Sequence, residues 1–112
     1  MLTVRRVTDG AIHVNAERYV RSLVLTPDEV VGDWHDKPVD DLSETDFAAV
    51  IDGSPEIVLL GTGMHNIFPP RDLVFAFARR GIGFETMDTP AAARTFNVLA
   101  TEGRRVTAVL YL

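Results

Sequence analysis

The stretch from Thr89 to Gly103 constrains the fold most, because it carries helix signals at both of its ends. Thr89 is the expected N-cap, and Pro90 follows at the first helical position, where a proline removes no hydrogen bond. Gly103 is the expected terminator, so the pattern predicts a helix that runs to Glu102. The apolar side chains form one stripe at helical spacing, made of Ala92, Ala93, Phe96, Leu99 and Ala100. Such a helix has to pack its stripe against another layer.

The elements around this helix predict parallel strands for the second half of the chain. Residues 56–60 contain a continuous apolar run, which is typical of a strand covered on both faces. Phe68-Pro69-Pro70 can open a helix and Arg79-Arg80-Gly81 can close it. The apolar face of that helix would be Leu73, Val74 and Phe77. Strands at 82–87 and 106–112 complete a βαβαβ order, for which right-handed crossovers are expected.

The first third of the chain has the pattern of antiparallel strands separated by turns. We expect strands at 3–7, 11–14 and 18–26, the third one central because both of its faces carry bulky side chains. Residues 29–34 can add a short strand before an acidic loop at 36–41. A short helix follows, with a capping box between Ser43 and Asp46 and a left-handed cap at Gly53. The sequence thus predicts an α/β fold, with residues 1–112 as one domain.

Composition and charge disfavour several classes of partner. The net charge of −5 and the lack of a basic run argue against nucleic acid and against anionic membrane surfaces. The chain has no cysteine, so it cannot use a disulfide, a thiolate metal site or a cysteine nucleophile. It shows no export signal, and its longest apolar runs are about half of the ~20 residues that a transmembrane helix needs. We therefore expect a cytoplasmic protein that is a monomer or a weak homodimer.

One candidate ligand site centres on Gly61-Thr62-Gly63, between the buried strand and the next helix. Its backbone N–H groups can approach an anion, and Arg94, Asn97 and Arg104 can add polar groups to a pocket for an anion or a carboxylate. The loop matches neither the dinucleotide fingerprint, which would need glycine at Asn66, nor the Walker pattern. The alternatives are structural. The glycines allow tight turning or close packing, Asn97 satisfies loop backbone as a buried amide, and Arg104 anchors the helix end.

Metal and catalytic motifs are weaker. Asp33-Trp34-His35-Asp36 offers oxygen and nitrogen ligands that His13 or His65 can in principle join, but the spacing matches no zinc motif. Trp34 itself suits a hydrophobic core or an interface. The serines lack the Gly-x-Ser-x-Gly elbow of a hydrolase nucleophile. We accordingly assign no catalytic residue, no metal ligand and no cofactor.

The loop after Gly63 carries three apolar side chains, those of Met64, Ile67 and Phe68. If they are exposed, they form a surface suited to a protein partner, because methionine and aromatic residues are enriched at interfaces. The structural alternative is a hydrophobic staple that closes the following helix. The two roles are compatible.

A set of residues in the second half of the chain resembles a known family. The specific block is Met87-Asp88-Thr89-Pro90, Ala92, Thr95-Phe96-Asn97-Val98-Leu99 and Glu102-Gly103-Arg104, preceded by Gly61-Thr62-Gly63 and Gly81-Ile82-Gly83. In these residues the chain resembles the Mth-like domain family, which is of unknown function and includes an assembly factor of mitochondrial respiratory complex I and an adipogenesis-associated protein. The resemblance implies a three-layer β/β/α fold and transfers no catalytic residue. Many members carry cysteine where this chain has Ala93, so a thiol function proposed for them cannot operate here.

Two hypotheses about function remain open. The first is a non-catalytic binding or assembly-factor-like module that acts through a protein partner, because the strongest motifs lie in turns, caps and packing positions rather than in a paired acid and base. The second is a small anionic-ligand binding protein, or an enzyme, that uses a cleft at the Gly61-Thr62-Gly63 loop.

Overall fold

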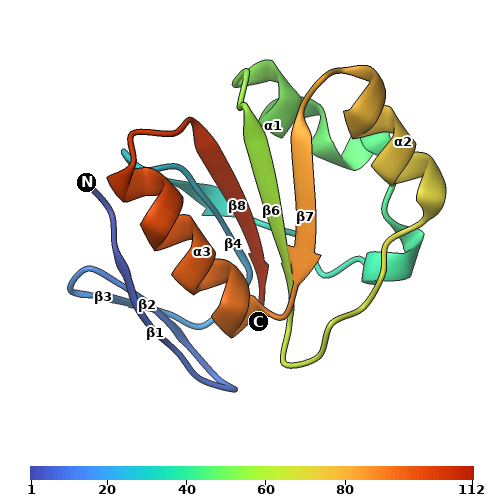
Figure 1. The fold of residues 1–112 in the computed structure, drawn as a ribbon. Coiled ribbons are helices and arrows are strands. Elements are labelled where there is room, and N and C mark those ends of the chain that lie inside the picture. The colour runs from blue at the N-terminus through green and yellow to red at the C-terminus, as the bar shows by residue number, and fades with distance from the viewer.

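β8 (Val106–Tyr111) lies at the centre of a five-stranded sheet in the computed structural model of the chain, which describes residues 1–112 (Figure 1). On one side β8 pairs in parallel with β6 (Ile57–Thr62), which pairs in parallel with β7 (Gly83–Met87). On the other side β8 pairs antiparallel with β4 (Leu23–Leu25), and β5 (Val30–Asp33) forms the edge next to β4. The sheet is therefore mixed, and β8 joins its antiparallel and parallel parts.

A second, three-stranded sheet is built from the N-terminal residues. β1 (Val4–Val7), β2 (Ile12–Val14) and β3 (Glu17–Tyr19) pair antiparallel in sequence order, as the turn signals predict. α3 (Thr89–Thr101) lies beside this small sheet, and both face the same side of the five-stranded sheet (Figure 1). The core between them contains the apolar stripe of α3, whose Phe96 is fully buried.

The opposite face of the five-stranded sheet is covered by α1 (Ala48–Asp52) and α2 (Arg71–Arg79), with two short 3-10 helices, η1 (Val39–Asp41) and η2 (Glu44–Phe47). A second core lies there, in which the ring of Phe77 packs against the rings of Phe47 and Phe84. The three layers confirm the predicted α/β architecture with antiparallel N-terminal strands. None of the helices combines the length and the apolar character needed to cross a membrane.

The two parallel crossovers place their helices on opposite faces of the sheet. β6 leads through α2 to β7 on one side, and β7 leads through α3 to β8 on the other side of β6. Connections that run in opposite directions along a sheet reach opposite faces when they share one hand. The carboxyl ends of β6 and β7 therefore lie at a topological switch point, the position at which open α/β sheets commonly bind their ligands.

The predicted single strand at 18–26 is wrong, because that run is divided between the two sheets. β3 ends at Tyr19 in the small sheet, and β4 begins at Leu23 in the large one. Val20 and Arg21 lie exposed in the crossing segment. The bulky side chains on both faces predict one central strand. In the structure β4 is interior, between β5 and β8, whereas β3 lies at the edge of the small sheet.

The boundaries of α3 differ slightly from the predicted ones. Asp88, rather than Thr89, is the N-cap, and its carboxylate accepts a hydrogen bond of 2.8 Å from the N–H of Ala91. Pro90 is therefore the second helical residue, a position whose N–H also has no partner within the helix. Gly103 terminates the helix with a φ of 76°, as predicted.

Two other helix ends also differ from expectation. Gly53 has an ordinary helical φ of −72°, and the left-handed conformation falls on Ser54, with a φ of 54°. Pro70 is the N-cap of α2 and precedes its first turn instead of opening it. Val74 is exposed, so the buried face of α2 consists of Leu73, Ala76 and Phe77.

Candidate functional site

The Gly61-Thr62-Gly63 loop lies at the carboxyl end of β6, directly against the start of α3. A Cβ atom on Gly61 would lie 2.9 Å from the Cα of Thr89 and 3.1 Å from the Cβ of Ala92. Gly63 has a φ of 93°, a conformation that side chains other than glycine rarely adopt. Gly61 thus permits close packing of strand and helix, and Gly63 permits the turn that follows.

The backbone N–H of Gly63 forms a hydrogen bond within the protein. The hydroxyl of Thr89 accepts a hydrogen bond of 2.8 Å from the N–H of Gly63 and donates one of 2.6 Å to the carbonyl of Tyr111. The N–H of Thr89 donates to the carbonyl of Gly63 at 2.7 Å. One fully buried hydroxyl group thus connects α3 to the residue after β6 and to the end of β8.

The side chain of Thr62 fixes the course of the loop that follows. Its hydroxyl donates a hydrogen bond of 2.5 Å to the carbonyl of His65 and accepts one of 3.0 Å from the N–H of Ile67. Thr62 is buried whereas His65 and Ile67 are exposed, so both bonds are partly shielded from water. The segment from Gly63 to Ile67 is therefore held in one conformation by its own strand.

The apolar side chains of this loop are turned to solvent. Met64 is 49% exposed, Ile67 44% and Phe68 76%, and Phe68 is the most exposed of the large apolar residues. A fixed loop that exposes a phenylalanine has the composition of a protein-binding surface. We call Met64, Ile67 and Phe68 the apolar loop surface.

Arg104 lies far from the Gly61-Thr62-Gly63 loop. It follows the C-terminus of α3, whereas the loop contacts the first residue of that helix, and 13 residues of α-helix span about 20 Å. Its Nε donates a hydrogen bond of 3.0 Å to Glu56. A hydrogen bond from the backbone N–H of Arg105 is the main cause that lowers the pKa of Glu56, and the bond from Arg104 adds to it. The position is that of a helix-end anchor.

Asn97 and Arg94 face β1. The side-chain oxygen of Asn97 accepts a hydrogen bond of 2.9 Å from the N–H of Val4, and its nitrogen donates one of 2.8 Å to the carbonyl of Val4. Arg94 lines a groove that α3 forms with β1. The joint binding of an anion by Gly61, Thr62, Gly63, Arg94, Asn97 and Arg104 stays a prediction. Four of these residues, Thr62, Gly63, Asn97 and Arg104, have hydrogen-bond partners within the protein.

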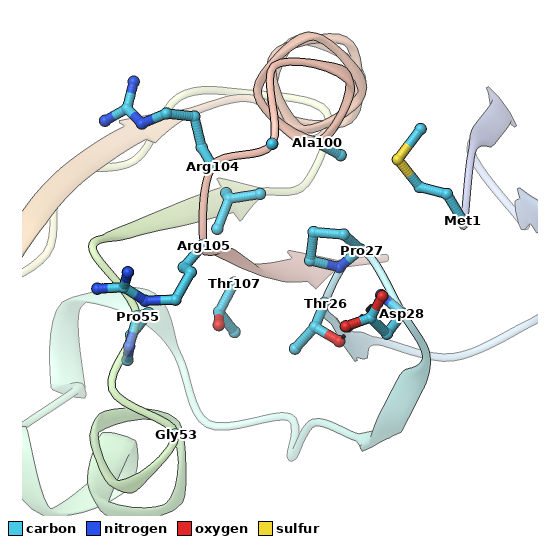
Figure 2. Close-up of a pocket in the computed structure, with 12 residues that line it drawn as sticks. Met1, Thr26, Pro27, Asp28, Gly53, Pro55, Ala100, Arg104, Arg105 and Thr107 are labelled. Atoms are coloured by element: carbon cyan, nitrogen blue, oxygen red, sulfur yellow. Dashed lines mark hydrogen bonds between the residues drawn. The ribbon is translucent and has the colours of Figure 1, made fainter.

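A cavity of about 450 Å³ lies at the amino ends of the parallel strands, opposite the end that carries the Gly61-Thr62-Gly63 loop (Figure 2). Residues from the β4–β5 turn, the end of α3 and the start of β8 line it, among them Thr26, Pro27, Ala100 and Thr107. In Figure 2 the guanidinium groups of Arg104 and Arg105 point away from the space between these residues. Its size suits a small molecule, and its polar lining residues include Thr26, Asp28 and Thr107.

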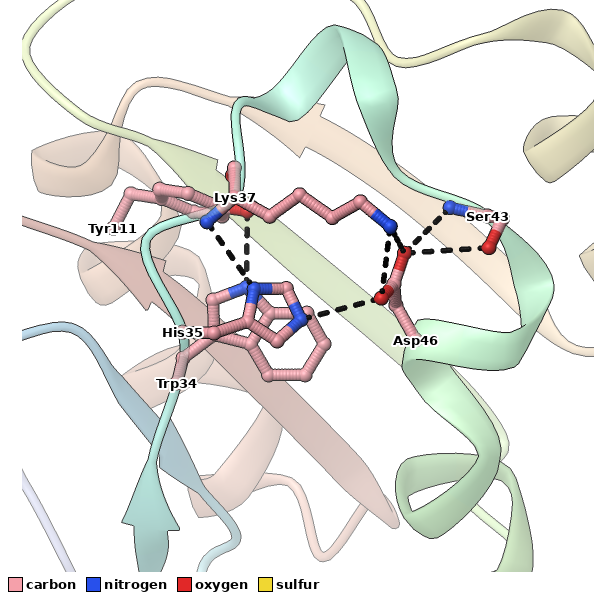
Figure 3. Close-up of polar contacts among 6 residues, drawn as sticks. All are labelled: Trp34, His35, Lys37, Ser43, Asp46 and Tyr111. Carbon is pink, nitrogen blue, oxygen red and sulfur yellow. Dashed lines mark hydrogen bonds and ion pairs between the residues drawn. The ribbon is translucent and has the colours of Figure 1, made fainter.

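A polar cluster surrounds Asp46 on the helical face of the sheet (Figure 3). Its carboxylate accepts hydrogen bonds from the N–H of Ser43 at 2.9 Å and from Nζ of Lys37 at 3.1 Å, and His35 Nε2 lies 3.4 Å away. Burial by itself would raise the pKa of Asp46, but the bond from Ser43 and the charge of Lys37 outweigh it and lower the pKa. This arrangement confirms the capping box predicted between Ser43 and Asp46.

The same segment is tied to β8 through Trp34, which is buried in the core. Its Nε1 donates a hydrogen bond of 3.0 Å to the hydroxyl of Tyr111, and that hydroxyl donates one of 2.7 Å to the carbonyl of Lys37 (Figure 3). Burial raises the pKa of Tyr111, and the charges of Asp46 and Asp36 act in the same direction. His, Asp and Glu side chains do not gather in a group of three that could hold a metal ion.

Comparisons with known proteins agree with this geometry. A family model described as protein of unknown function (DUF498/DUF598) matches residues 4–111. The chain is 35% identical over 99 residues to NADH dehydrogenase (ubiquinone) 1 alpha subcomplex assembly factor 3 from Bos taurus, which covers 87% of this chain and 53% of that protein. It is 28% identical over 104 residues to the 13 kDa major membrane protein of Francisella tularensis, covering 90% of this chain and 83% of that one. The chain thus spans about half the length of the assembly factor.

Solved structures show the same fold. The structure of a protein from Xanthomonas campestris superimposes with a TM-score of 0.89 at 39% identity, covering 99% of this chain and 84% of the other. A Mth938-like domain from Bordetella pertussis gives a TM-score of 0.74 at 28% identity, covering 98% and 85%. The three-layer arrangement is therefore common to these proteins.

Proposed function

The chain belongs to the DUF498/DUF598 family of proteins of unknown function, and from this membership we propose that it is an assembly-factor-like binding module that acts through a protein partner. Membership also confirms the resemblance to the Mth-like domain family that the sequence indicates. The partner would bind the apolar loop surface. The observation that carries the proposal is the exposure of Phe68, which is 76% accessible on a loop of fixed conformation.

Two physical arguments support this surface. Exposure of large apolar side chains to water costs free energy, and this cost is recovered when a partner covers them. The hydrogen bonds of Thr62 to His65 and Ile67 order the loop before binding, so the partner does not have to supply the entropy cost of ordering it. Relatives that span the same fold include an assembly factor, and assembly factors bind other proteins.

The internal bonding of the Gly61-Thr62-Gly63 loop also favours a protein partner over a small ligand. A phosphate-binding turn presents free N–H groups, whereas the N–H of Gly63 is bonded to Thr89. The exposed side chains of the loop are apolar, which suits a protein better than an anion.

Site-specific photo-crosslinking in cells that naturally contain the protein tests the proposal. The photoreactive analogue p-benzoylphenylalanine replaces Phe68 in one variant and Val98 in the control, because Val98 is 56% exposed on α3, away from the loop. We expect a discrete crosslinked protein from position 68 and none of the same mass from position 98. Equal adducts at both positions, or none at position 68, would contradict a partner on the apolar loop surface.

The remaining expectations are tested separately. Light scattering after size exclusion distinguishes the proposed monomer or weak homodimer from a stable oligomer. Cell fractionation tests the proposed cytoplasmic location, for which the membrane protein of Francisella tularensis is a reason to look at the membrane fraction as well. A filter-binding assay at low salt tests the expected lack of affinity for nucleic acid.

A further inference from the structure

A groove of about 210 Å³ runs between β1 and the first half of α3. It is lined by Val4, Arg5, Arg6 and Val7 from the strand and by Pro90, Ala93 and Arg94 from the helix. Three of these seven residues are arginines, although the chain as a whole has a net charge of −5. The groove therefore concentrates positive charge on an acidic protein.

The local backbone explains why two consecutive arginines reach the same groove. In a regular strand, neighbouring side chains point to opposite faces. Here the pairing of β1 with β2 shifts register between Val4 and Arg6, which leaves Arg5 as an extra residue in the strand. A bulge of this kind redirects a side chain, and Arg5 and Arg6 are both exposed. β1 thus contributes two arginines to the groove that Arg94 lines from the helix.

None of the three arginines has a carboxylate within ion-pairing distance. The ion pairs of the protein involve the other basic residues Arg21, His35, Lys37, Arg80 and Arg104. Like charges held close together repel one another unless an opposite charge lies between them. An anion in the groove would remove that repulsion, and three guanidinium forks would supply paired N–H donors to its oxygens.

A further arginine, Arg18, lies on the same face of the small sheet as Arg6. Arg6 lies opposite His13 on β2, and His13 lies opposite Arg18 on β3. Directly opposite residues share one face of an antiparallel sheet. Ile12 and Val14 are buried, so the residue between them, His13, lies on the outer face of the small sheet with Arg6 and Arg18, and Arg6 is the residue of this row that borders the groove. The charge of Arg18 adds to the attraction for an anion that approaches the groove.

We propose that the groove between β1 and α3 binds a small oxyanion, a phosphate or carboxylate group, through Arg5, Arg6 and Arg94. Its volume lies below the ~300–1,000 Å³ of sites for drug-sized ligands, so it accommodates the anionic group and leaves the rest of a larger ligand outside. This site is separate from the Gly61-Thr62-Gly63 loop and from the apolar loop surface, and it does not depend on the proposed partner.

Nitrogen-15 NMR titrations test the site. Inorganic phosphate and succinate are added in separate experiments at constant ionic strength, maintained with chloride, and the side-chain Nε–H signals of arginine are followed. We expect saturable shifts of Arg5, Arg6 and Arg94 and of the amides of β1. Phosphate alone, or succinate alone, identifies which oxyanion the groove prefers, and either result supports the proposal. No saturable shift with either anion overturns it.

Matched variants separate the groove from general charge effects. Arg94→Gln is expected to weaken the apparent affinity about tenfold or more, the equivalent of one charge-assisted hydrogen bond. Arg79→Gln is the control, because Arg79 is also an exposed helical arginine without an ion pair. Each variant's spectrum shows directly that it is folded. Equal loss in both variants, or unchanged affinity in Arg94→Gln, also overturns the proposal.

Discussion

The side chain of Asn97 forms two hydrogen bonds to the backbone of Val4, one to its N–H and one to its carbonyl. These bonds attach α3 to the edge of the small sheet in the way that a neighbouring strand would. Asn97→Ala leaves both backbone groups of Val4 without a partner in a half-buried site, so we expect a loss of about 1–3 kcal/mol in the free energy of unfolding. Urea denaturation measures it.

Val98→Ala is the control for this experiment, because Val98 is exposed on the same helix and its substitution should stay within about 0.5 kcal/mol. Unchanged stability of Asn97→Ala would show that water replaces the carboxamide. Retained phosphate binding in a destabilised Asn97→Ala would assign Asn97 to the structure and not to the anion groove.

The close contact of Gly61 with α3 leads to a second prediction. Gly61→Ala forces a methyl group into the backbone of Thr89, so either the helix or the strand must move. We expect a loss of about 1–3 kcal/mol from overpacking, seen as a lower melting temperature. Gly10→Ala is the matched control, because a Cβ there meets nothing within 4 Å. Equal melting temperatures for the two variants would contradict the contact.

Removal of the Thr89 hydroxyl is expected to destabilise the contact between α3 and the Gly61-Thr62-Gly63 loop. Thr89→Val keeps the shape of the side chain but leaves the N–H of Gly63 and the carbonyl of Tyr111 without their partner. The unpaired groups should lower the free energy of unfolding by about 2 kcal/mol or more, and the amide of Gly63 should exchange its hydrogen faster. Thr101→Val, at an exposed position of α3, should change stability little. A Gly63 amide that stays protected would rule out the role of the hydroxyl.

Asp46 provides a prediction about pH. Its pKa in the folded protein lies below the ordinary value of 3.8, so its ionised form stabilises the fold above that pH, and the contribution is lost as the pH falls through the folded pKa. Asp46→Asn should cost about 1 kcal/mol at neutral pH, in the range of a lost helix cap, and much less at about pH 2. Chemical denaturation at both pH values measures the difference. The exposed Asp52, changed to Asn, should retain the pH dependence of the original protein.

Periodicity and turn residues predict the second half of the fold well. The helix from Thr89 and the strands on either side of it stand out because apolar spacing and end signals coincide there. The run at 18–26 shows the limit of such patterns. Its alternation continues through Val20 and Arg21, and nothing local reveals that the chain leaves one sheet for the other at that point.

The functional residues are harder to place than the elements. Gly61 is recognisable as a special position, but its closeness to Thr89 follows from the crossover through α2 and β7. Arg94 is recognisable as a polar residue on α3, whereas its meeting with Arg5 and Arg6 depends on a bulge in β1 that involves no glycine or proline. The cavity near Thr26 and Thr107 likewise assembles from turns that are distant in sequence.

The central place of β8 has a consequence for how the protein is made. β4 and β6 are synthesised first, but neither pairs with the other, since each uses β8 as its neighbour. Until residues 106–111 leave the ribosome, both strands carry an open hydrogen-bonding edge, which is the arrangement most prone to aggregation. Completion of the large sheet therefore waits for β8, and the partly made sheet should depend on chaperones during that interval more than a sheet whose last-made strand lies at an edge.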